Sequence, residues 1–143
     1  MLFRSEQTTR FFTEKILAVP DEVWGAPIDM HGPTTADTLL WARLAEVEFH
    51  HHDLGVDEGV ALLDHRQLAL LLAALQRTYL RTRWTDGSGP GFVLAPDGIG
   101  PVEVGGGGPT ISGSPVAVAL WIAGRSDGSD LESDEPLPEL PGW

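Results

Sequence analysis

One stretch in the first half of the chain decides the fold, because it is long, helical in pattern and carries the polar residues that bear on chemistry. Residues 40–55 read LWARLAEVEFHHHDLG. Gly55 stands where a helix would end, since glycine readily adopts the left-handed conformation that closes a helix C-terminus. The hydroxyl of Thr34 or Thr35 can serve as the N-cap. The sequence therefore predicts a helix from about residue 34 or 35 to Leu54.

Three polar residues fall on an apolar side of this predicted helix. At about 100° per residue they share one stripe with several apolar side chains. A charge buried without a partner is costly, so such residues must pair with one another, line a wet cavity or bind an ion. We take them as the candidate site. They are Arg43, Glu46 and His50, and the apolar stripe comprises Ala36, Leu39, Leu40, Val47 and Leu54.

The spacing within this cluster suits a metal ion. Glu46 and His50 are four residues apart, so one helical turn brings a carboxylate oxygen and an imidazole nitrogen to one side. That makes two ligands of a metal site and not a whole one; a solvated pair or a buried hydrogen bond is the alternative. His51 and His52 diverge around the helix and are interpreted as structural or surface residues. Asp53 could orient a histidine, cap the next turn or be a surface carboxylate.

The rest of the chain divides near Trp84, where the composition changes. Before that point, further helices are expected at residues 6–18 and 64–81, and a loop containing Trp24, Pro27 and Pro33 separates the first of them from the central helix. Together the three helices make an incomplete bundle. After that point glycines punctuate short strand-like pieces. The predicted class is α+β, with a helical half-bundle at residues 1–83 and a small α/β domain at residues 84–143.

The second half is predicted in more detail from its turns. Strands at residues 92–94 and 102–104 pair around the Pro96-Asp97-Gly98 turn, and a helix at residues 116–124 begins after Ser114 and Pro115. The run Gly105 to Gly108 lacks the Lys-Ser or Lys-Thr of a phosphate loop and is interpreted as a flexible connection without a catalytic role. Residues 127–139 hold six acidic residues and are expected to be a solvated tail, held by Leu137, Leu140 and Trp143.

Composition excludes several classes of function. The formal net charge of -12 argues against binding a phosphate backbone, so we expect no nucleic acid partner. Residues 84–143 contribute -8 of this charge, since they hold nine acidic residues and only Arg125. The chain has no cysteine, so any thiol chemistry must use an external thiol. Its apolar stretches are too short to span a membrane and no signal pattern opens it, which predicts a cytoplasmic protein.

Several motifs in order resemble one family. The helix at residues 40–55 looks like the metal-site helix of the mycothiol-dependent maleylpyruvate isomerases, which belong to the DinB-like metalloenzymes. The segment VPDEVW at residues 19–24 resembles the turn before that helix in the family. The segments SGSP at 112–115, LWIAGR at 120–125 and LPELPGW at 137–143 are similar to the family's small C-terminal domain. The resemblance covers nearly the whole chain and is carried by the order and spacing of these motifs.

The resemblance implies a partial DinB-like bundle and a chemistry. A divalent metal, usually zinc, would be held by Glu46 and His50 together with a histidine from an earlier helix. The metal would bind and activate mycothiol or another small thiol, which adds to an unsaturated or electrophilic small-molecule substrate. This makes the chain an isomerase or thiol transferase, and the lack of cysteine agrees with an external thiol. Arg43 and Arg125 would recognise a substrate carboxylate; the alternatives are an ion pair with Glu46 for Arg43 and a helix C-terminal charge for Arg125.

The chain also departs from the family. Members have two more helices at the N-terminus, one of which carries the remaining histidine ligand, and neither His31 nor His65 matches it. We therefore expect an N-terminally truncated member whose bundle is completed by a homodimer or by a partner chain. Two other readings remain open. One is a metal-free enzyme that uses the same pocket for acid–base chemistry on a biosynthetic small molecule, and the other is a non-catalytic binding or partner subunit.

Overall fold

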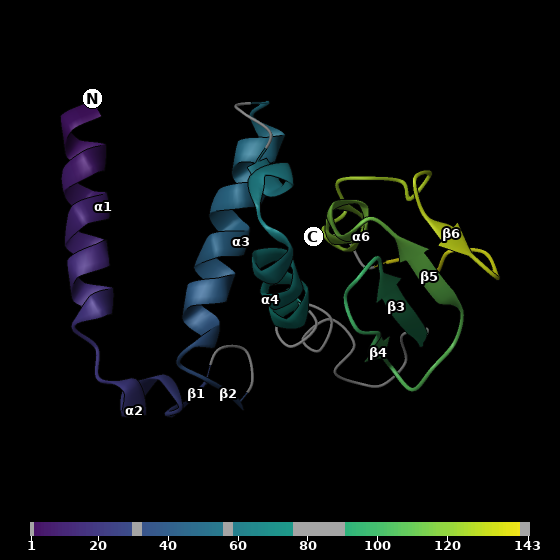
Figure 1. Ribbon diagram of the computed structural model, residues 1–143, viewed down its shortest axis with the longest axis horizontal. Helices are drawn as coiled ribbons and strands as arrows, with labels where there is room; N and C mark the ends of the chain where they lie inside the picture. The colour runs from purple at the N-terminus through teal and green to yellow at the C-terminus, as the bar shows by residue number, and fades with distance from the viewer. Residues whose placement is uncertain (1, 30–32, 56–58, 76–90, 141–143) are drawn as a thin grey trace. The chain divides into compact units, whose positions relative to one another are not determined.

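A computed structural model describes residues 2–29, 33–55, 59–75 and 91–140 (Figure 1). The chain forms two compact units, Met1–Asp37 and Thr38–Trp143. The predicted boundary between residues 83 and 84 lies outside the described residues and stays a prediction. Within the described ranges, no helix has both the length and the apolar character needed to cross a membrane.

The first unit holds two helices and a hairpin. Helix α1 runs over Leu2–Leu17, which confirms the first predicted helix and extends it towards the N-terminus. A short helix, α2 (Asp21–Trp24), follows Pro20. Strands β1 (Pro27–Asp29) and β2 (Pro33–Thr35) then pair antiparallel, with Pro27 opposite Thr35. Part of the predicted loop is therefore a hairpin. The sequence does not predict it, because the segment has too few apolar residues between its prolines to show a strand pattern.

The hairpin corrects the predicted start of the central helix. Helix α3 spans Thr38–Asp53, so Thr34 and Thr35 lie in strand β2 and do not cap it. The Thr35 hydroxyl instead donates to the Asp37 carboxylate. The predicted end of the helix is confirmed, because Gly55 has a φ of 61° and its N–H bonds to the His52 carbonyl.

Helix α3 buries a different side from the predicted one. Its buried residues are Thr38, Ala45 and Phe49, of which two are small enough to allow close packing. This side contacts the 3₁₀ helix at Gly59–Leu62 and helix α4 (His65–Leu75). Leu39 and Leu54 of the predicted stripe are 48% and 72% exposed. Ala36 of the stripe is buried and Leu40 and Val47 are partly buried, so the stripe is only partly buried in this structure.

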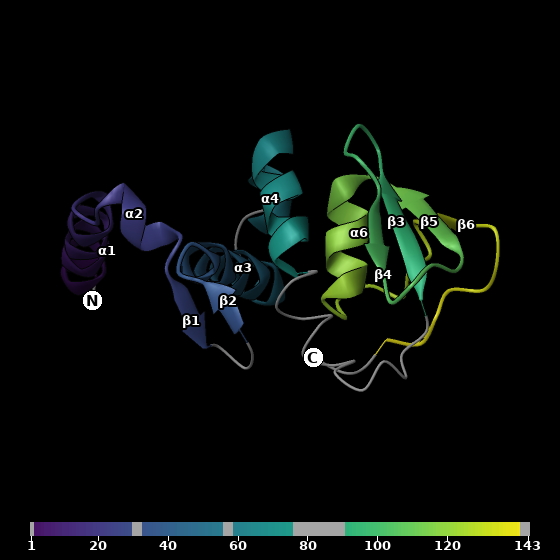
Figure 2. The same cartoon turned by 90° about the horizontal axis from the view of Figure 1, so that it is seen from below.

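The second unit continues as a mixed sheet covered by a helix. Strand β3 (Phe92–Pro96) pairs antiparallel with β4 (Val102–Val104) and parallel with β5 (Thr110–Gly113). Helix α6 (Pro115–Ile122) begins at Ser114, whose hydroxyl accepts the Ala117 N–H as an N-cap. Figure 2 shows α6 between α4 and the sheet. The predicted α+β class, the β3–β4 hairpin and the start of α6 are confirmed.

One core joins the helices to the sheet in this unit. The α6 side chains Val118, Trp121 and Ile122 are buried together with Phe92 and Leu71. The rings of Phe92 and Trp121 meet edge to face with their centres 5.7 Å apart. Helices α3 and α4 therefore share an apolar core with the C-terminal strands.

The acidic tail is more ordered than predicted. Strand β6 (Glu132–Ser133) pairs antiparallel with β5, and the Thr110 N–H donates to the Asp134 carboxylate. The carboxylates face solvent as expected, but the backbone completes the sheet order β4-β3-β5-β6. Leu137 and Leu140 pack against the core as predicted, whereas Trp143 lies outside the described residues.

The glycine run is a specific turn and more than a flexible connection. Gly105 to Gly108 all have positive φ, with values of 70°, 95°, 89° and 148°. A Cβ on Gly91 would lie 1.9 Å from the Gly107 carbonyl oxygen, and one on Gly108 would lie 1.9 Å from the Gly91 carbonyl oxygen. Two backbone segments therefore touch where only glycine fits.

The Gly91→Ala variant should lower the free energy of unfolding by about 1–3 kcal/mol, because the backbone must shift to admit the methyl group. Urea unfolding followed by circular dichroism measures this change. The control is Gly100→Ala, since a Cβ there meets nothing within 4 Å. Equal stability of the two variants would contradict the close contact.

Candidate functional site

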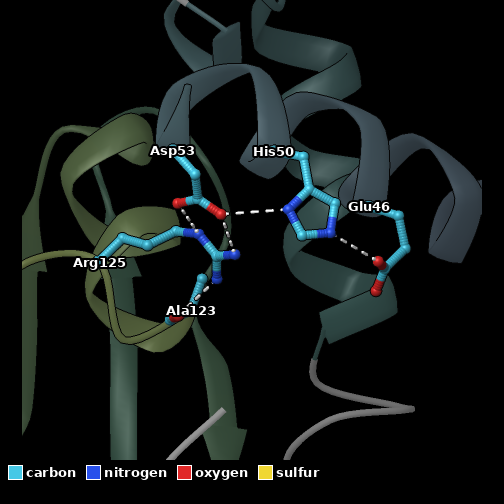
Figure 3. A network of polar contacts seen from close by, with 5 residues as sticks. All are labelled: Glu46, His50, Asp53, Ala123 and Arg125. Carbon is cyan, nitrogen blue, oxygen red and sulfur yellow. Dashed lines mark hydrogen bonds and ion pairs between the residues drawn. The ribbon is translucent and has the colours of Figure 1, made fainter. Parts of the chain in front are cut away.

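The last two turns of helix α3 carry a chain of polar contacts centred on His50 (Figure 3). His50 Nε2 lies 3.3 Å from Glu46 Oε2, and His50 Nδ1 lies 3.2 Å from Asp53 Oδ2. The spacings of four and three residues place the two carboxylates on opposite edges of the ring. The imidazole is thus held between two carboxylates of its own helix.

Arg125 ties Asp53 to the C-terminal part of the unit. Its Nε donates to Asp53 Oδ1 at 2.8 Å and its Nη2 donates to Asp53 Oδ2 at 2.7 Å, a two-point contact. Its Nη1 donates to the Ala123 carbonyl at 2.8 Å, and the guanidinium lies 5.0 Å from the centre of the Phe49 ring. The Arg125 side chain is only 11% exposed. Its orientation is therefore set by contacts on several sides.

The end of helix α6 explains why Arg125 points this way. Gly124 has a φ of 68°, and its N–H bonds to the Trp121 carbonyl. The Arg125 N–H bonds to the Leu120 carbonyl at 2.8 Å. This pair of bonds is a Schellman motif, which reverses the chain at a helix C-terminus. The sequence Ala123-Gly124-Arg125 thereby returns the guanidinium towards helix α3.

The charges along this chain follow from the ion pair. Hydrogen bonds from Arg125 lower the pKa of Asp53 below its ordinary value of 3.8, with a smaller lowering from His50 and an opposing effect of burial. Asp53 is therefore ionised near neutral pH and can only accept hydrogen bonds. A hydrogen bond between His50 Nδ1 and Asp53 Oδ2 therefore requires the proton to be on Nδ1. His50 Nε2 then faces Glu46 either with a second proton or with a lone pair.

The pair formed by Glu46 and His50 has the chemistry of two metal ligands. Two acceptor atoms 3.3 Å apart repel unless a proton or a cation lies between them. Zinc bonds of about 2.0–2.1 Å at tetrahedral angles place neighbouring ligand atoms about 3.3 Å apart. The two side chains therefore fit a divalent metal as half of its ligands. Within the described ranges no group of three or more His, Cys, Asp or Glu residues could complete such a site.

The predicted residues separate into two groups. Glu46, His50 and Arg125 are brought together through Asp53, whereas Arg43 is exposed and forms no ion pair with Glu46. Glu46 and His50 are also exposed, and of the three expected arrangements the structure shows the pairing of these two residues with each other. The sequence allowed Asp53 to orient a histidine, but it did not show that Asp53 also binds Arg125. Its place three residues after His50 was a signal, but its partner is 72 residues away.

Comparisons with known proteins show which family profile and which solved structures the chain is similar to. The family profile described as the MDMPI C-terminal domain matches residues 78–142. The crystal structures of the mycothiol-dependent maleylpyruvate isomerase and of a histidine-to-alanine mutant of it are each similar to this chain, with a TM-score of 0.68 and 22% identity. Each alignment covers 96% of this chain and 58% of the isomerase chain. No curated protein matches.

The chain is thus an α+β protein with a carboxylate–imidazole pair on a helix that packs against an MDMPI-like C-terminal domain. Its described fold is similar to that of the mycothiol-dependent maleylpyruvate isomerase, and it spans 58% of that protein's length. The profile supports the predicted family resemblance for residues 78–142, and the similarity of fold extends over 96% of the chain.

The Asp53–Arg125 pair should make stability depend on pH in acid. Because the folded-state pKa of Asp53 is lowered below 3.8, its stabilisation is complete above that value and is lost as the pH falls through the folded-state pKa. The difference in unfolding free energy between the wild type and Asp53→Asn should therefore shrink below about pH 4. Urea unfolding between pH 7 and pH 2 measures this difference.

The matched control is the same substitution in an Arg125→Met background. Without the guanidinium, Asp53→Asn should change stability less, and the change should vary less with pH. If the difference between the wild type and Asp53→Asn does not vary with pH when Arg125 is present, the pair does not stabilise the ionised carboxylate.

Proposed function

We propose that the chain is part of a maleylpyruvate-isomerase-like enzyme, a metal- and thiol-dependent isomerase or transferase acting on a small unsaturated or electrophilic substrate. The contact between Glu46 Oε2 and His50 Nε2 carries this proposal, because its 3.3 Å separation suits two ligands of one divalent metal. The similarity to the mycothiol-dependent maleylpyruvate isomerase supports it. The chain's own lack of cysteine agrees with an external thiol, for which mycothiol is the first candidate.

Each residue of the site then has a separate task. Glu46 and His50 would hold the metal, zinc being the first choice for an oxygen and nitrogen ligand set. A bound metal of this kind lowers the pKa of a coordinated thiol and so supplies a thiolate near neutral pH. Both side chains are more than half exposed, so a thiol and a substrate can approach them.

Arg43 is the better of the two arginines for recognising a substrate carboxylate. It is exposed and lies one turn before Glu46 on the same helix. Arg125 is already bound on both edges of its guanidinium, by Asp53 and by the Ala123 carbonyl. We therefore propose Arg43 for substrate binding and give Arg125 a different role below.

We propose that a second copy or a helical partner chain covers the exposed side of helix α3 and supplies a further ligand. Leu39 and Leu54 flank the polar residues on this side and are 48% and 72% exposed. Helix α1 also exposes Phe11 and Leu17, by 60% and 80%. Its unit ends at Asp37, and units of fewer than about 40 residues without disulfides usually need a partner.

A metal-free enzyme is the second candidate. The observation in its favour is that the His50 ring lies between Glu46 and Asp53, an arrangement that also suits proton transfer at Nε2. Activity that survives exhaustive chelation and falls on replacing Glu46 would select this candidate over the first.

Purified protein should contain divalent metal in stoichiometric amount, and Glu46→Ala and His50→Ala should each reduce it at least tenfold, because each removes one of the ligands. Elemental analysis after dialysis measures the metal content. His51→Ala is the control, since it removes a neighbouring exposed histidine. Unchanged metal in both site variants would contradict the proposed metal site.

Sedimentation should give a mass greater than that of one 15.4 kDa chain. A charge on the open side of helix α3, as in Leu39→Glu, should return the protein to the monomer, because burying the carboxylate without a partner is costly. Val23→Glu is the control, as Val23 is 42% exposed on helix α2. A monomeric wild type would contradict a homodimer, and a partner chain would then be sought by reconstitution.

A further inference from the structure

Asp53 and Arg125 form a contact that the proposed function does not use. The two residues are 72 positions apart, and their ion pair connects the end of helix α3 to the turn after helix α6. The Arg125 side chain is nearly buried, and the Asp53 side chain is 36% exposed. Figure 3 shows that Asp53 lies between the guanidinium and the His50 ring. The contact therefore reaches the site through one residue.

We infer that Asp53, held by Arg125, is the positioning residue that keeps the proton of His50 on Nδ1 and its lone pair on Nε2. Arg125 is likewise a positioning residue, and it acts one step further from the site. This inference rests on the proposed function, because an oriented Nε2 lone pair matters most if His50 is a metal ligand.

The geometry gives the reason. A guanidinium that donates from Nε and Nη2 to both oxygens of one carboxylate fixes the plane of that carboxylate. Asp53 Oδ2 is then directed at His50 Nδ1, 3.2 Å away. Because Oδ2 belongs to an ionised group, it can only accept, so the proton must be on Nδ1. A carboxylate behind a metal-binding histidine fixes both the tautomer and the ring orientation in this way.

Other contacts keep Arg125 from turning away. Its third donor, Nη1, is bound to the Ala123 carbonyl at 2.8 Å, and the guanidinium is near the ring of buried Phe49. A lysine at this position could supply the charge but not the two-point contact. The C-terminal strands and helix α6 thus influence a site on helix α3 that they do not themselves form.

The first test reads the His50 tautomer without any metal. In the chelator-treated wild type labelled with ¹⁵N-histidine, a two-bond ¹H–¹⁵N spectrum at about pH 9, where ordinary imidazoles are neutral, should show His50 with its proton on Nδ1. The His50 signal is the one absent from His50→Gln. Asp53→Asn should lose this preference, because an amide can turn its N–H₂ towards Nδ1. A wild-type ring protonated on Nε2, alone or together with Nδ1, would overturn the inference.

The second test measures zinc affinity by competition with a chromophoric chelator. Asp53→Asn and Arg125→Met should weaken zinc binding by about 10- to 100-fold, the usual effect of removing such a supporting residue. Arg125→Lys should lie between Arg125→Met and the wild type. Asp127→Asn is the control, because it removes the same charge from an exposed position in the same unit.

The outcomes separate the inference from the proposed function. If the wild type binds no zinc but shows the Nδ1–H tautomer that Asp53→Asn removes, the metal proposal fails and the positioning role stands. If zinc binds through Glu46 and His50 but Asp53→Asn binds it as tightly as Asp127→Asn, the metal proposal stands and the positioning role fails. Circular dichroism of each variant excludes unfolding as the cause of a lost signal.

Discussion

The rest of the second unit depends on the burial of helix α6. Its eight residues, PVAVALWI, are apolar on every side, so one covering surface cannot keep the helix from water. Strands β3 and β5 contact it, and so does helix α4. Buried side chains of α6, the sheet and helices α3 and α4 accordingly form one cluster. This constraint brings the end of helix α3 within reach of the turn after α6.

The turn after α6 brings Arg125 into contact with Asp53 at the end of helix α3. Gly124 permits the left-handed conformation, and the chain reversal returns Arg125 towards Asp53. Phe49 belongs both to the apolar core and to the surroundings of Arg125, since it is fully buried in the apolar cluster and its ring lies beside the guanidinium. The arrangement of the polar chain from Arg125 to Glu46 thus rests on the apolar core beneath it. A change in that core would be expected to reach His50 through Arg125.

The sequence predicts the features that are encoded locally. Gly55 ends helix α3, and Ser114 with Pro115 begins helix α6, because capping depends on a few adjacent residues. The predicted start and the predicted buried side of α3 differ from the structure, because both depend on contacts with residues outside the helix. Thr35 pairs with Pro27 in a hairpin, and α3 carries apolar residues on opposite sides, so periodicity cannot tell which side meets a partner. The family motifs pointed to Glu46 and His50, but only the fold connects Asp53 to Arg125.

The two halves of the site differ in how far their side chains are exposed to solvent. In the half formed by Asp53 and Arg125, the Arg125 side chain is nearly buried and the Asp53 side chain is 36% exposed, and the two-point contact fixes the geometry of the pair. The half formed by Glu46 and His50 faces solvent, where an ion pair alone contributes little to stability. His50 is also in contact with the Asp53 carboxylate on the other edge of its ring, and the metal that we propose would bind on the edge that faces Glu46. Leu39 and Leu54 are exposed beside this pair, and they would form the apolar border of the surface on which the proposed partner packs.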